Sequence, residues 1–455
     1  MLKVTFVALS LSCAAMAQDA RSAIENAAKS IGAADLKSIQ YSGSGSAFTL
    51  GQNVNPTVPW PKVTVTSYTR TVDYANPGYR DEVVRTTPAG EQRQTQFVSG
   101  KYAWNMTGSN TTAAPAATAE RLTQIWLTPH GFLKAAMASQ ATAKSKTQNG
   151  KKFTVVSFAG HGKHKIDGVI DDQGAVERVE TRIENPVMGD MLVETVYSDY
   201  KDFGGVKFPT RIVQKQGGHP TLELTVSDVK PNVSVSLAAP PAMQQATVPA
   251  VRVESQKIAD GVWYLTGGSH HSVLVEFKDD LAVIEGPLNQ ERAKAVIAEV
   301  KKLVPDKPLR YVVNTHHHFD HSGGLRAFAG EGITIITHEM NKPYYSKMFK
   351  GKFQTLSDRR AITDGSRTME LHLIKGNPHN DGILMAYLPK EKLLVEADVY
   401  TPAPPNAQPP ATPNPASVNL YENIERLRLD VAQIVPIHGR VVPLSELQKA
   451  IGKAN

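Results

Sequence analysis

A run of histidines in the second half of the chain restricts its fold and chemistry more than any other feature. The segment Arg310–Asn314 predicts a buried strand, and four histidines and one aspartate then lie within the six positions 316–321. In an extended loop alternate side chains share a face, so His316 and His318 can reach one cation. Asp320 and His321 then turn toward a second cation. Because imidazoles and carboxylates are metal ligands, we interpret this loop as a candidate metal site.

The same loop resembles the signature of a known family. Its pattern of His-x-His-x-Asp-His followed by glycines is similar to that of the metallo-β-lactamase superfamily, and the resemblance covers about Val251–Ile451. The superfamily places a third histidine, a bridging aspartate and a last histidine after later strands. In this chain His379, Asp398 and His438 match them, 61 residues after His318 and then at intervals of 19 and 40 residues.

The resemblance implies a site for two metal ions that make a hydroxide nucleophile. Nitrogen and oxygen ligands without thiolate suit zinc, with iron and manganese as alternatives. A zinc-bound water has its pKa lowered from 15.7 to about 7, so hydroxide exists at neutral pH. Asp320 is the catalytic candidate, because it would orient this water and accept or relay its proton. The implied ligands are His316, His318 and His379 for one ion, Asp320, His321 and His438 for the other, and Asp398 between them.

The resemblance also implies a fold and a reaction. Residues 251–455 are expected to form an α/β domain, a four-layer αββα sandwich with the metals at one edge between the sheets. The expected enzyme is a zinc-dependent metallo-hydrolase that cleaves an acyl bond of a small molecule, in an ester, lactone, thioester or β-lactam. Dedicated β-lactamases with this signature generally lack the bridging aspartate, whereas glyoxalase II has it. Asp398 therefore favours a general acyl hydrolase, although Ala397 stands where many members carry glycine.

The N-terminus predicts export. Lys3 provides a positive charge, Val4–Leu11 an apolar core, and Ala15–Ala17 a small-residue cleavage pattern. We expect residues 1–17 to be a signal peptide, cleaved after Ala17, and the protein to be periplasmic or secreted. Lipidation at Cys13 is the alternative interpretation, but the leucine expected three positions earlier is missing. Cys13 is the one cysteine of the chain, so the mature protein would offer only histidine and carboxylate ligands.

Two domains are predicted beyond the signal peptide. Residues 18–237 alternate short apolar and polar runs that are typical of antiparallel strands, with a helical pattern from about Thr118 to Lys144 that Pro129 interrupts. Several of these strand segments weakly resemble the open half-barrel of periplasmic lipoprotein carriers. Residues 238–250, rich in alanine, proline and glutamine, predict a linker before the domain of residues 251–455.

Other features leave alternatives open. A net charge of +7 without a run of five lysines or arginines gives no indication of nucleic-acid binding, and the apolar N-terminal run is too short to span a membrane. His317 is expected to have a structural role, and His270 to lie in a solvated loop or contact substrate. Thr401–Ser417 holds seven prolines, so it should be neither helix nor central strand, and it is a lid or a connector. A binding protein that carries an apolar ligand in its first domain is the alternative function.

Overall fold

The computed structural model describes residues 20–87, 90–160, 164–405, 407–408 and 410–453, which form two compact units. The first unit contains the chain up to Thr49, Trp60–Glu184 and Asp190–Pro249. The second contains residues 250–455 together with the short segments Leu50–Pro59 and Asn185–Gly189. The sequence did not predict that these two segments lie in the second unit. The predicted signal peptide, residues 1–17, lies outside the described residues.

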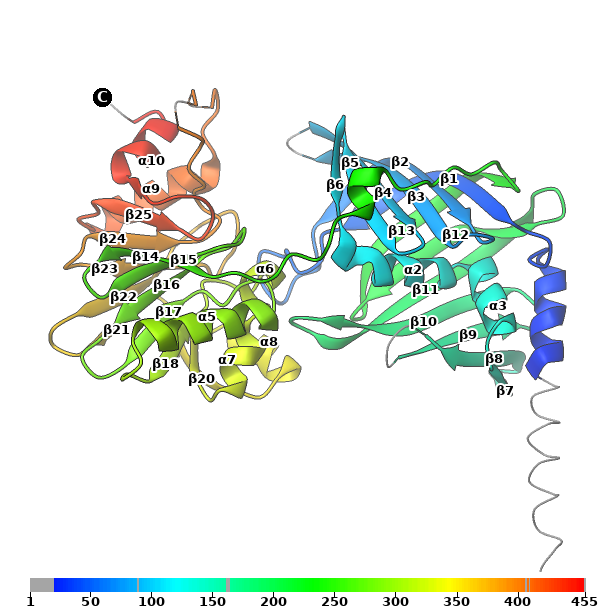
Figure 1. The fold of residues 1–455 in the computed structure, drawn as a ribbon, viewed down its shortest axis with the longest axis horizontal. Helices are drawn as coiled ribbons and strands as arrows, with labels where there is room; N and C mark the ends of the chain where they lie inside the picture. The colour runs from blue at the N-terminus through cyan, green and yellow to red at the C-terminus, as the bar shows by residue number, and fades with distance from the viewer. Residues whose placement is uncertain (1–19, 88–89, 161–163, 406, 409, 454–455) are drawn as a thin grey trace, which may run out of the picture. The chain divides into compact units, whose positions relative to one another are not determined.

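The first unit is built on one sheet of thirteen antiparallel strands (Figure 1). Its order is β6-β5-β4-β3-β2-β1-β13-β12-β11-β10-β9-β8-β7, so the first and last strands pair in the middle of the sheet. This arrangement confirms the prediction of a mainly antiparallel N-terminal part. The strands are β1 (Ser38–Phe48), β2 (Lys62–Asp73), β3 (Gly78–Thr87), β4 (Gly90–Ser99), β5 (Tyr102–Thr107), β6 (Asn110–Ala113), β7 (Thr142–Gln148), β8 (Lys151–Ala159), β9 (Lys165–Asp171), β10 (Val176–Asn185), β11 (Gly189–Asp202), β12 (Lys207–Gln216) and β13 (His219–Pro231).

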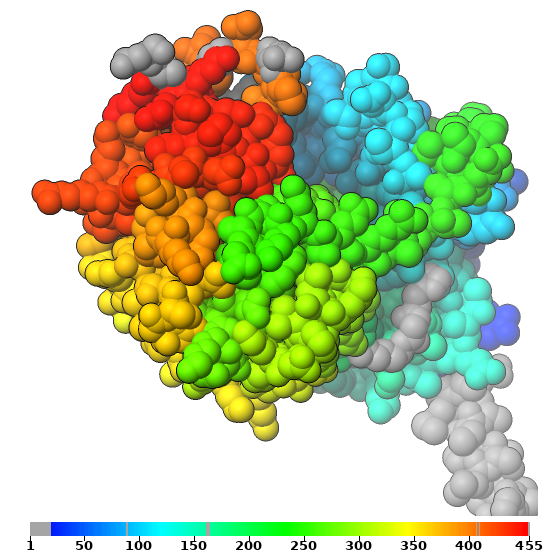
Figure 2. Space-filling model, turned by 60° about the vertical axis from the view of Figure 1, so that its left-hand side comes forward, coloured from blue at the N-terminus to red at the C-terminus, as the bar shows by residue number. Residues whose placement is uncertain are grey.

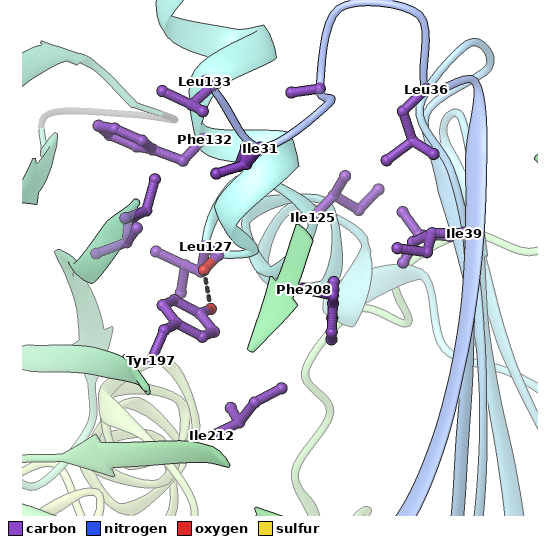
Figure 3. Packing of buried hydrophobic residues seen from close by; sticks show 14 of the residues in the cluster. Ile31, Leu36, Ile39, Ile125, Leu127, Phe132, Leu133, Tyr197, Phe208 and Ile212 are labelled. Carbon is purple, nitrogen blue, oxygen red and sulfur yellow. Dashed lines mark hydrogen bonds between the residues drawn. The ribbon is translucent and has the colours of Figure 1, made fainter. Parts of the chain in front are cut away.

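Helices cover the apolar face of this sheet. They are residues 20–30, the 3₁₀ turn η1 (Pro115–Ala117), α2 (Thr118–Trp126) and α3 (Pro129–Met137). Figure 3 shows Phe132 and Leu133 of α3 in the same buried cluster as the strand residue Phe208, and these three side chains are fully buried. The hydroxyl of Tyr197 donates a hydrogen bond to the carbonyl of Leu127, which fixes the turn between α2 and α3.

The predicted helical region is too long at its C-terminal end. Pro129 does interrupt it, because it begins α3 at a position where a helix needs no amide donor. Residues 142–148 instead form the edge strand β7, which pairs with β8. This strand is almost wholly exposed and consists mainly of lysine, serine and threonine, which suits a sheet edge.

The second unit contains two mixed sheets (Figure 1). The seven-stranded sheet has the order β14-β15-β16-β17-β18-β19-β20, and the six-stranded sheet runs from β21 to β26 in sequence order. The strands of the first are β14 (Glu254–Ala259), β15 (Val262–Thr266), β16 (Ser272–Glu276), β17 (Leu281–Ile284), β18 (Leu309–Val313), β19 (Thr334–His338) and β20 (Lys352–Leu356). Those of the second are β21 (Arg359–Thr363), β22 (Thr368–Leu373), β23 (Leu384–Leu388), β24 (Leu393–Glu396), β25 (Gln433–Pro436) and β26 (Val442–Pro443).

Helices flank the pair of sheets on both sides, which confirms the predicted αββα sandwich. One core lies between the two sheets. It contains Ala282 and Ile284 of the seven-stranded sheet and Val395 and Val435 of the six-stranded sheet. A second core packs helices on the seven-stranded sheet and a third packs helices on the six-stranded sheet. The first helix layer has α5 (Gln290–Leu303), α7 (Leu325–Gly330) and α8 (Asn341–Met348), and the second has α9 (Pro415–Leu427) and α10 (Leu444–Ala450).

The start and the end of this unit meet at its surface. Figure 2 shows the residues after about 250 (green) bordering the last residues of the chain (red). The hydroxyl of Tyr264 in β15 donates to the carbonyls of Pro436 and Gly439, at 2.6 and 2.9 Å. These bonds tie the loop after β25 to the opposite sheet.

The predicted linker and the proline-rich segment each contain the start of a helix. Pro241–Gln244 forms the short helix α4 inside the predicted linker. Pro415 is the first residue of α9, and the side chain of Asn414 caps it by accepting from the Ala416 amide at 2.9 Å. The prediction that 401–417 contains no helix is therefore wrong for its last three residues, because proline is well suited to the first helical position. No described helix is both long and apolar enough to cross a membrane.

A buried ion pair in the first unit generates a stability prediction. Arg70 in β2 and Asp81 in β3 are cross-strand neighbours, and their side chains are 13% and 8% exposed. Removing one partner leaves an uncompensated buried charge, which costs about 3–5 kcal/mol. We expect Asp81→Ala to lower the free energy of unfolding by this amount in urea denaturation. Glu91→Ala, which breaks an exposed pair with Arg93, should cost less than about 1 kcal/mol, and equal effects would contradict the prediction.

Candidate metal centre

Parallel strand pairs bring the candidate ligands to one edge of the sandwich. β17 pairs with β18 and β24 with β25 in parallel, so the carboxyl ends of each pair lie together. The histidine-rich loop follows β18 and enters the short helix α6 (Phe319–Ser322). Gly323 allows the close turn after α6, because a Cβ atom there would lie 1.9 Å from the carbonyl oxygen of Leu288. His379, Asp398 and His438 follow β22, β24 and β25.

The structure brings all seven predicted site residues together around Asp398. One carboxylate oxygen of Asp398, Oδ2, lies 3.0 Å from Nε2 of both His321 and His379, and 3.3 Å from Nε2 of His316. The other oxygen, Oδ1, lies 2.7 Å from Nε2 of His438. The carboxylate therefore contacts histidines that follow strands of both sheets.

The histidines around Asp398 form two groups. His316, His318 and His379 lie on one side, with Nε2 atoms of His316 and His379 only 3.4 Å apart. His321 and His438 lie on the other, with their Nε2 atoms 3.2 Å apart. A tetrahedral zinc ion with zinc–nitrogen distances of about 2.0–2.1 Å places two ligand nitrogens about 3.4 Å from each other. The spacing within each group fits such an ion.

One buried nitrogen supports this fit directly. Nδ1 of His318 is buried without a hydrogen-bond partner among the described residues, and buried polar atoms are almost always paired. Nε2 of His318 lies 3.0 Å from the carbonyl oxygen of Asn53, so Nδ1 is the nitrogen that His318 can offer to its group with His316, His379 and Asp398. Burial lowers the pKa of His318 to about 4, so its ring is neutral near pH 7 and has a lone pair to offer a cation.

A second carboxylate, Glu285, orients His321. Glu285 follows β17, is fully buried, and has Oε2 3.0 Å from Nδ1 of His321. The Thr315 hydroxyl also donates to Glu285. Burial disfavours the charged ring of His321, but contacts with Asp398 and Glu285 outweigh it and raise its pKa to about 10. A metal ion at Nε2 of His321 would take the place of a proton there, because metal binding releases protons from its ligands.

Asp320 lies at the edge of the second group. Its Oδ1 accepts a hydrogen bond from the side-chain amide of Gln52 at 2.8 Å, and its Oδ2 lies 3.3 Å from Nε2 of His270. Burial raises the pKa of Asp320, but contacts with His270, His321 and Gln52 outweigh it and hold the pKa below its usual range. Asp320 is therefore an ionised carboxylate with 38% of its side chain exposed.

The structure defines the surroundings of His317 and His270, which lie beside the candidate ligands. His317 is buried between Asn53 and Asn380, with Nε2 3.1 Å from Asn53 Oδ1 and Nδ1 3.1 Å from Asn380 Nδ2. This position agrees with its expected structural role. His270 does not lie in a solvated loop: it is 9% exposed and within ligand reach of His321 and His438.

Glu285, Gln52 and Asn53 were not identified from the sequence. Glu285 carries a local signal, because it is a charged residue directly after the wholly apolar strand β17. Gln52 and Asn53 carry none, because 268 positions separate Gln52 from its partner Asp320. Only the folded chain brings that segment to the histidine-rich loop.

Comparison with known proteins identifies the C-terminal part. Residues 265–429 match the family model described as the Metallo-beta-lactamase superfamily. This part of the chain belongs to that superfamily. The matched residues include the histidine-rich loop, His379 and Asp398, and they end before His438.

Three curated relatives match shorter parts of the chain. The chain is 25% identical over 157 residues to the 2,4-dinitroanisole O-demethylase subunit alpha of Nocardioides sp. (strain JS1661), covering 33% of this chain and 47% of that protein. It is 33% identical over 76 residues to a linear primary-alkylsulfatase of Pseudomonas sp, covering 16% and 11%. It is 36% identical over 110 residues to the probable metallo-hydrolase YqjP of Bacillus subtilis (strain 168), covering 23% and 30%. The chain thus spans less than half the length of each.

Solved structures match the same part of the chain. A metallo-beta-lactamase from Pontibacter korlensis is 20% identical, with 44% of this chain and 98% of that chain covered and a TM-score of 0.38. The metallo-beta-lactamase FIM-1 from Pseudomonas aeruginosa in the mono-zinc form is 18% identical, with 45% and 96% covered and a TM-score of 0.37.

Glu285 provides a test of the site that does not require a substrate. Glu285→Gln keeps the volume but removes the charge that orients His321, and loss of such supporting contacts typically lowers metal affinity about 10–100-fold. We expect this loss in zinc competition against a chromogenic chelator. Glu370→Gln is the matched control, because Glu370 also accepts from a histidine of this unit, His372, at 2.9 Å outside the site. Equal affinities of the two variants would contradict the role of Glu285.

Proposed function

We propose that the protein is an exported dinuclear zinc hydrolase that cleaves an acyl bond of a small molecule. The single observation that carries this proposal is the position of the Asp398 carboxylate, whose two oxygens lie 2.7–3.3 Å from four histidine Nε2 atoms. A carboxylate between two histidine groups is the arrangement that a bridging ligand needs. Export rests on the sequence of residues 1–17 alone.

The ligands divide between two ions in this proposal. His316 and His379 would bind through Nε2 and His318 through its unpaired Nδ1. His321 would bind through Nε2, because Nδ1 faces Glu285. When bound, zinc ions lower the pKa of water from 15.7 to about 7, which makes hydroxide available near neutral pH. The full proposed set is His316, His318 and His379, then Asp320, His321 and His438, with Asp398 shared.

Asp320 is the proposed catalytic carboxylate. Its pKa is held below the usual range, so it can accept a hydrogen bond from the attacking water. Gln52 occupies Oδ1, which leaves Oδ2 to receive or relay the proton. His270 lies 3.3 Å from this oxygen and can take part in moving the proton or binding substrate.

A cavity next to Asp398 suits a small-molecule substrate. It has a volume of ≈ 670 Å³ and is lined by Asp398, Tyr400, Arg440 and residues of the proline-rich segment, and Asp398 is the one candidate site residue in its lining. Ligand pockets for small molecules typically have volumes of about 300–1,000 Å³. The proposal therefore treats the proline-rich segment as the rim of a substrate pocket, not as a plain connector.

Asp398 also narrows the substrate class. The resemblance associates a bridging aspartate with general acyl hydrolases and not with dedicated β-lactamases. We therefore expect esters, lactones or thioesters to be better substrates than β-lactams. An aryl methyl ether and an alkyl sulfate belong in the same test, because two relatives are named for an O-demethylase and an alkylsulfatase.

The cavity described in the apolar core of the first unit is too small for the alternative function, an apolar-ligand carrier. The cavity bordered by Tyr41, Phe208 and Leu224 has a volume of ≈ 40 Å³, far below the size of a typical ligand pocket. The surrounding core is filled with buried side chains such as Phe132 and Ile212 (Figure 3). This filled core favours the hydrolase proposal.

Metal analysis tests the proposal. We expect two zinc ions per chain in the purified protein, and loss of hydrolysis on the ester, lactone and thioester panel after chelation. Readdition of zinc should restore the activity. A protein that takes up no metal when zinc is supplied would contradict the proposed function.

Two substitutions assign the roles of individual residues. Asp320→Ala should abolish turnover, and His379→Ala should lower both zinc content and rate. His372→Ala is the control, because His372 is a buried histidine of the same unit that contacts Glu370 and not the site. Full activity in the first two variants would show that the site assignment is wrong.

A further inference from the structure

The segment Leu50–Pro59 lies against the metal centre although it belongs to the N-terminal half of the sequence. It follows β1 and precedes β2, yet it is part of the second compact unit. Gly51 makes its close approach possible, because its φ is +67° and a Cβ atom there would lie 2.3 Å from the ring of Phe319. Phe319 stands between the candidate ligands His318 and Asp320.

Asn53 holds this segment in a fixed shape. It is 6% exposed, and its side-chain amide donates to the carbonyls of Asn55 and Val58, at 2.7 and 2.9 Å. Its side-chain oxygen lies 3.1 Å from Nε2 of His317. All polar atoms of this side chain are thus hydrogen-bonded, and these bonds hold the Asn53 main chain in place.

The main-chain carbonyl of Asn53 selects the ring nitrogen that His318 offers. Nε2 of His318 lies 3.0 Å from this oxygen, which can only accept a hydrogen bond. In a neutral imidazole one nitrogen donates and the other accepts, so Nδ1 must carry the free lone pair. That nitrogen is the buried, unpaired atom of the first histidine group.

Gln52 acts in the same way on Asp320. Its amide donates to Oδ1 at 2.8 Å, and Oδ2 remains on the side of His270 and His321, at 3.3 and 3.8 Å. Gln52 is half-buried and reaches the site from outside the histidine-rich loop.

The segment also contacts the loop that carries His379. The side-chain amide of Asn55 donates to the carboxylate of Asp381 at 2.7 Å. The main-chain amide of Asp381 donates to the carbonyl of Val54 at 2.8 Å. One segment therefore touches two ligand-bearing loops that follow strands of different sheets.

We propose that Leu50–Pro59 is a positioning segment of the metal centre, in which Asn53 orients His318 toward one metal ion and Gln52 orients Asp320 toward the other. This inference rests on the proposed function, because it requires a site that binds two metal ions. It assigns different ions to the two residues, which a general stabilising role of the loop would not do.

The test is the rate at which each zinc ion leaves full-length variants in excess chromogenic chelator. Asn53→Ala keeps the carbonyl but removes the side-chain hydrogen bonds that hold it against His318, and it should speed the release of one ion about 10-fold or more, as expected for loss of support to a ligand. Gln52→Leu should speed the release of the other ion, and the double variant should speed both. Val54→Thr is the control, because the Val54 side chain is 40% exposed, and it should release both ions at the wild-type rates.

The outcomes separate this inference from the proposed function. Two zinc ions in every protein, with unchanged release rates in Asn53→Ala and Gln52→Leu, would overturn the inference and leave the proposed function standing. Equal acceleration of both ions in each single variant, with a lower melting temperature, would indicate a structural loop and would also overturn it. A wild-type protein that binds no zinc would contradict the proposed function itself.

Discussion

The contact between the Asp398 carboxylate and four imidazoles is the interaction on which the rest of the site depends. A buried carboxylate without compensation costs several kcal/mol, and Asp398 is only 14% exposed. Burial raises its pKa, but hydrogen bonds from His316, His321 and the other two histidines outweigh this effect and keep the carboxylate ionised. Because those histidines follow strands of both sheets, the same contact fixes the two sheets against each other at this edge.

The backbone at this edge is held in an uncommon conformation. Glu285 and Asp398 have φ values of 78° and 61°, in the left-handed region that non-glycine residues seldom adopt. Such residues cluster at functional sites, where the surrounding structure compensates for the strain. Glu396 supplies part of this support, because its carboxylate side chain accepts from the amides of Val399 and Tyr400 at 3.2 Å each. Burial raises the pKa of Glu396 to about 8, so it adds little negative charge beside Asp398 at neutral pH.

The sequence predicted the parts of this arrangement that local pattern encodes. A local signal marks the histidine-rich loop and the later residues His379, Asp398 and His438, because each of them follows an apolar run that predicts a strand. α5 also carries a local signal, since Asn289 caps it and its apolar face is periodic. The structure brings those residues together, whereas their role as ligands stays a prediction.

Long-range contacts could not be predicted in this way. Gln52 and Asn53 lie in a polar loop whose sequence resembles any turn, and only tertiary packing brings them to the site. The predicted C-terminal end of the helical region was wrong for a related reason. Pairing with β8 overrides the local helical preference of residues 142–148. The helix that begins at Pro415 was not predicted, because proline both interrupts helices and occupies their first position.

The most direct measurement of the central claim is anomalous diffraction at the zinc absorption edge from crystals of the full-length protein. We expect two anomalous peaks about 3.5–4 Å apart, one on each side of the Asp398 carboxylate, with His318 Nδ1 facing the first and Asp320 facing the second. A single peak that Asp398 does not contact, or no peak in crystals supplied with zinc, would contradict it.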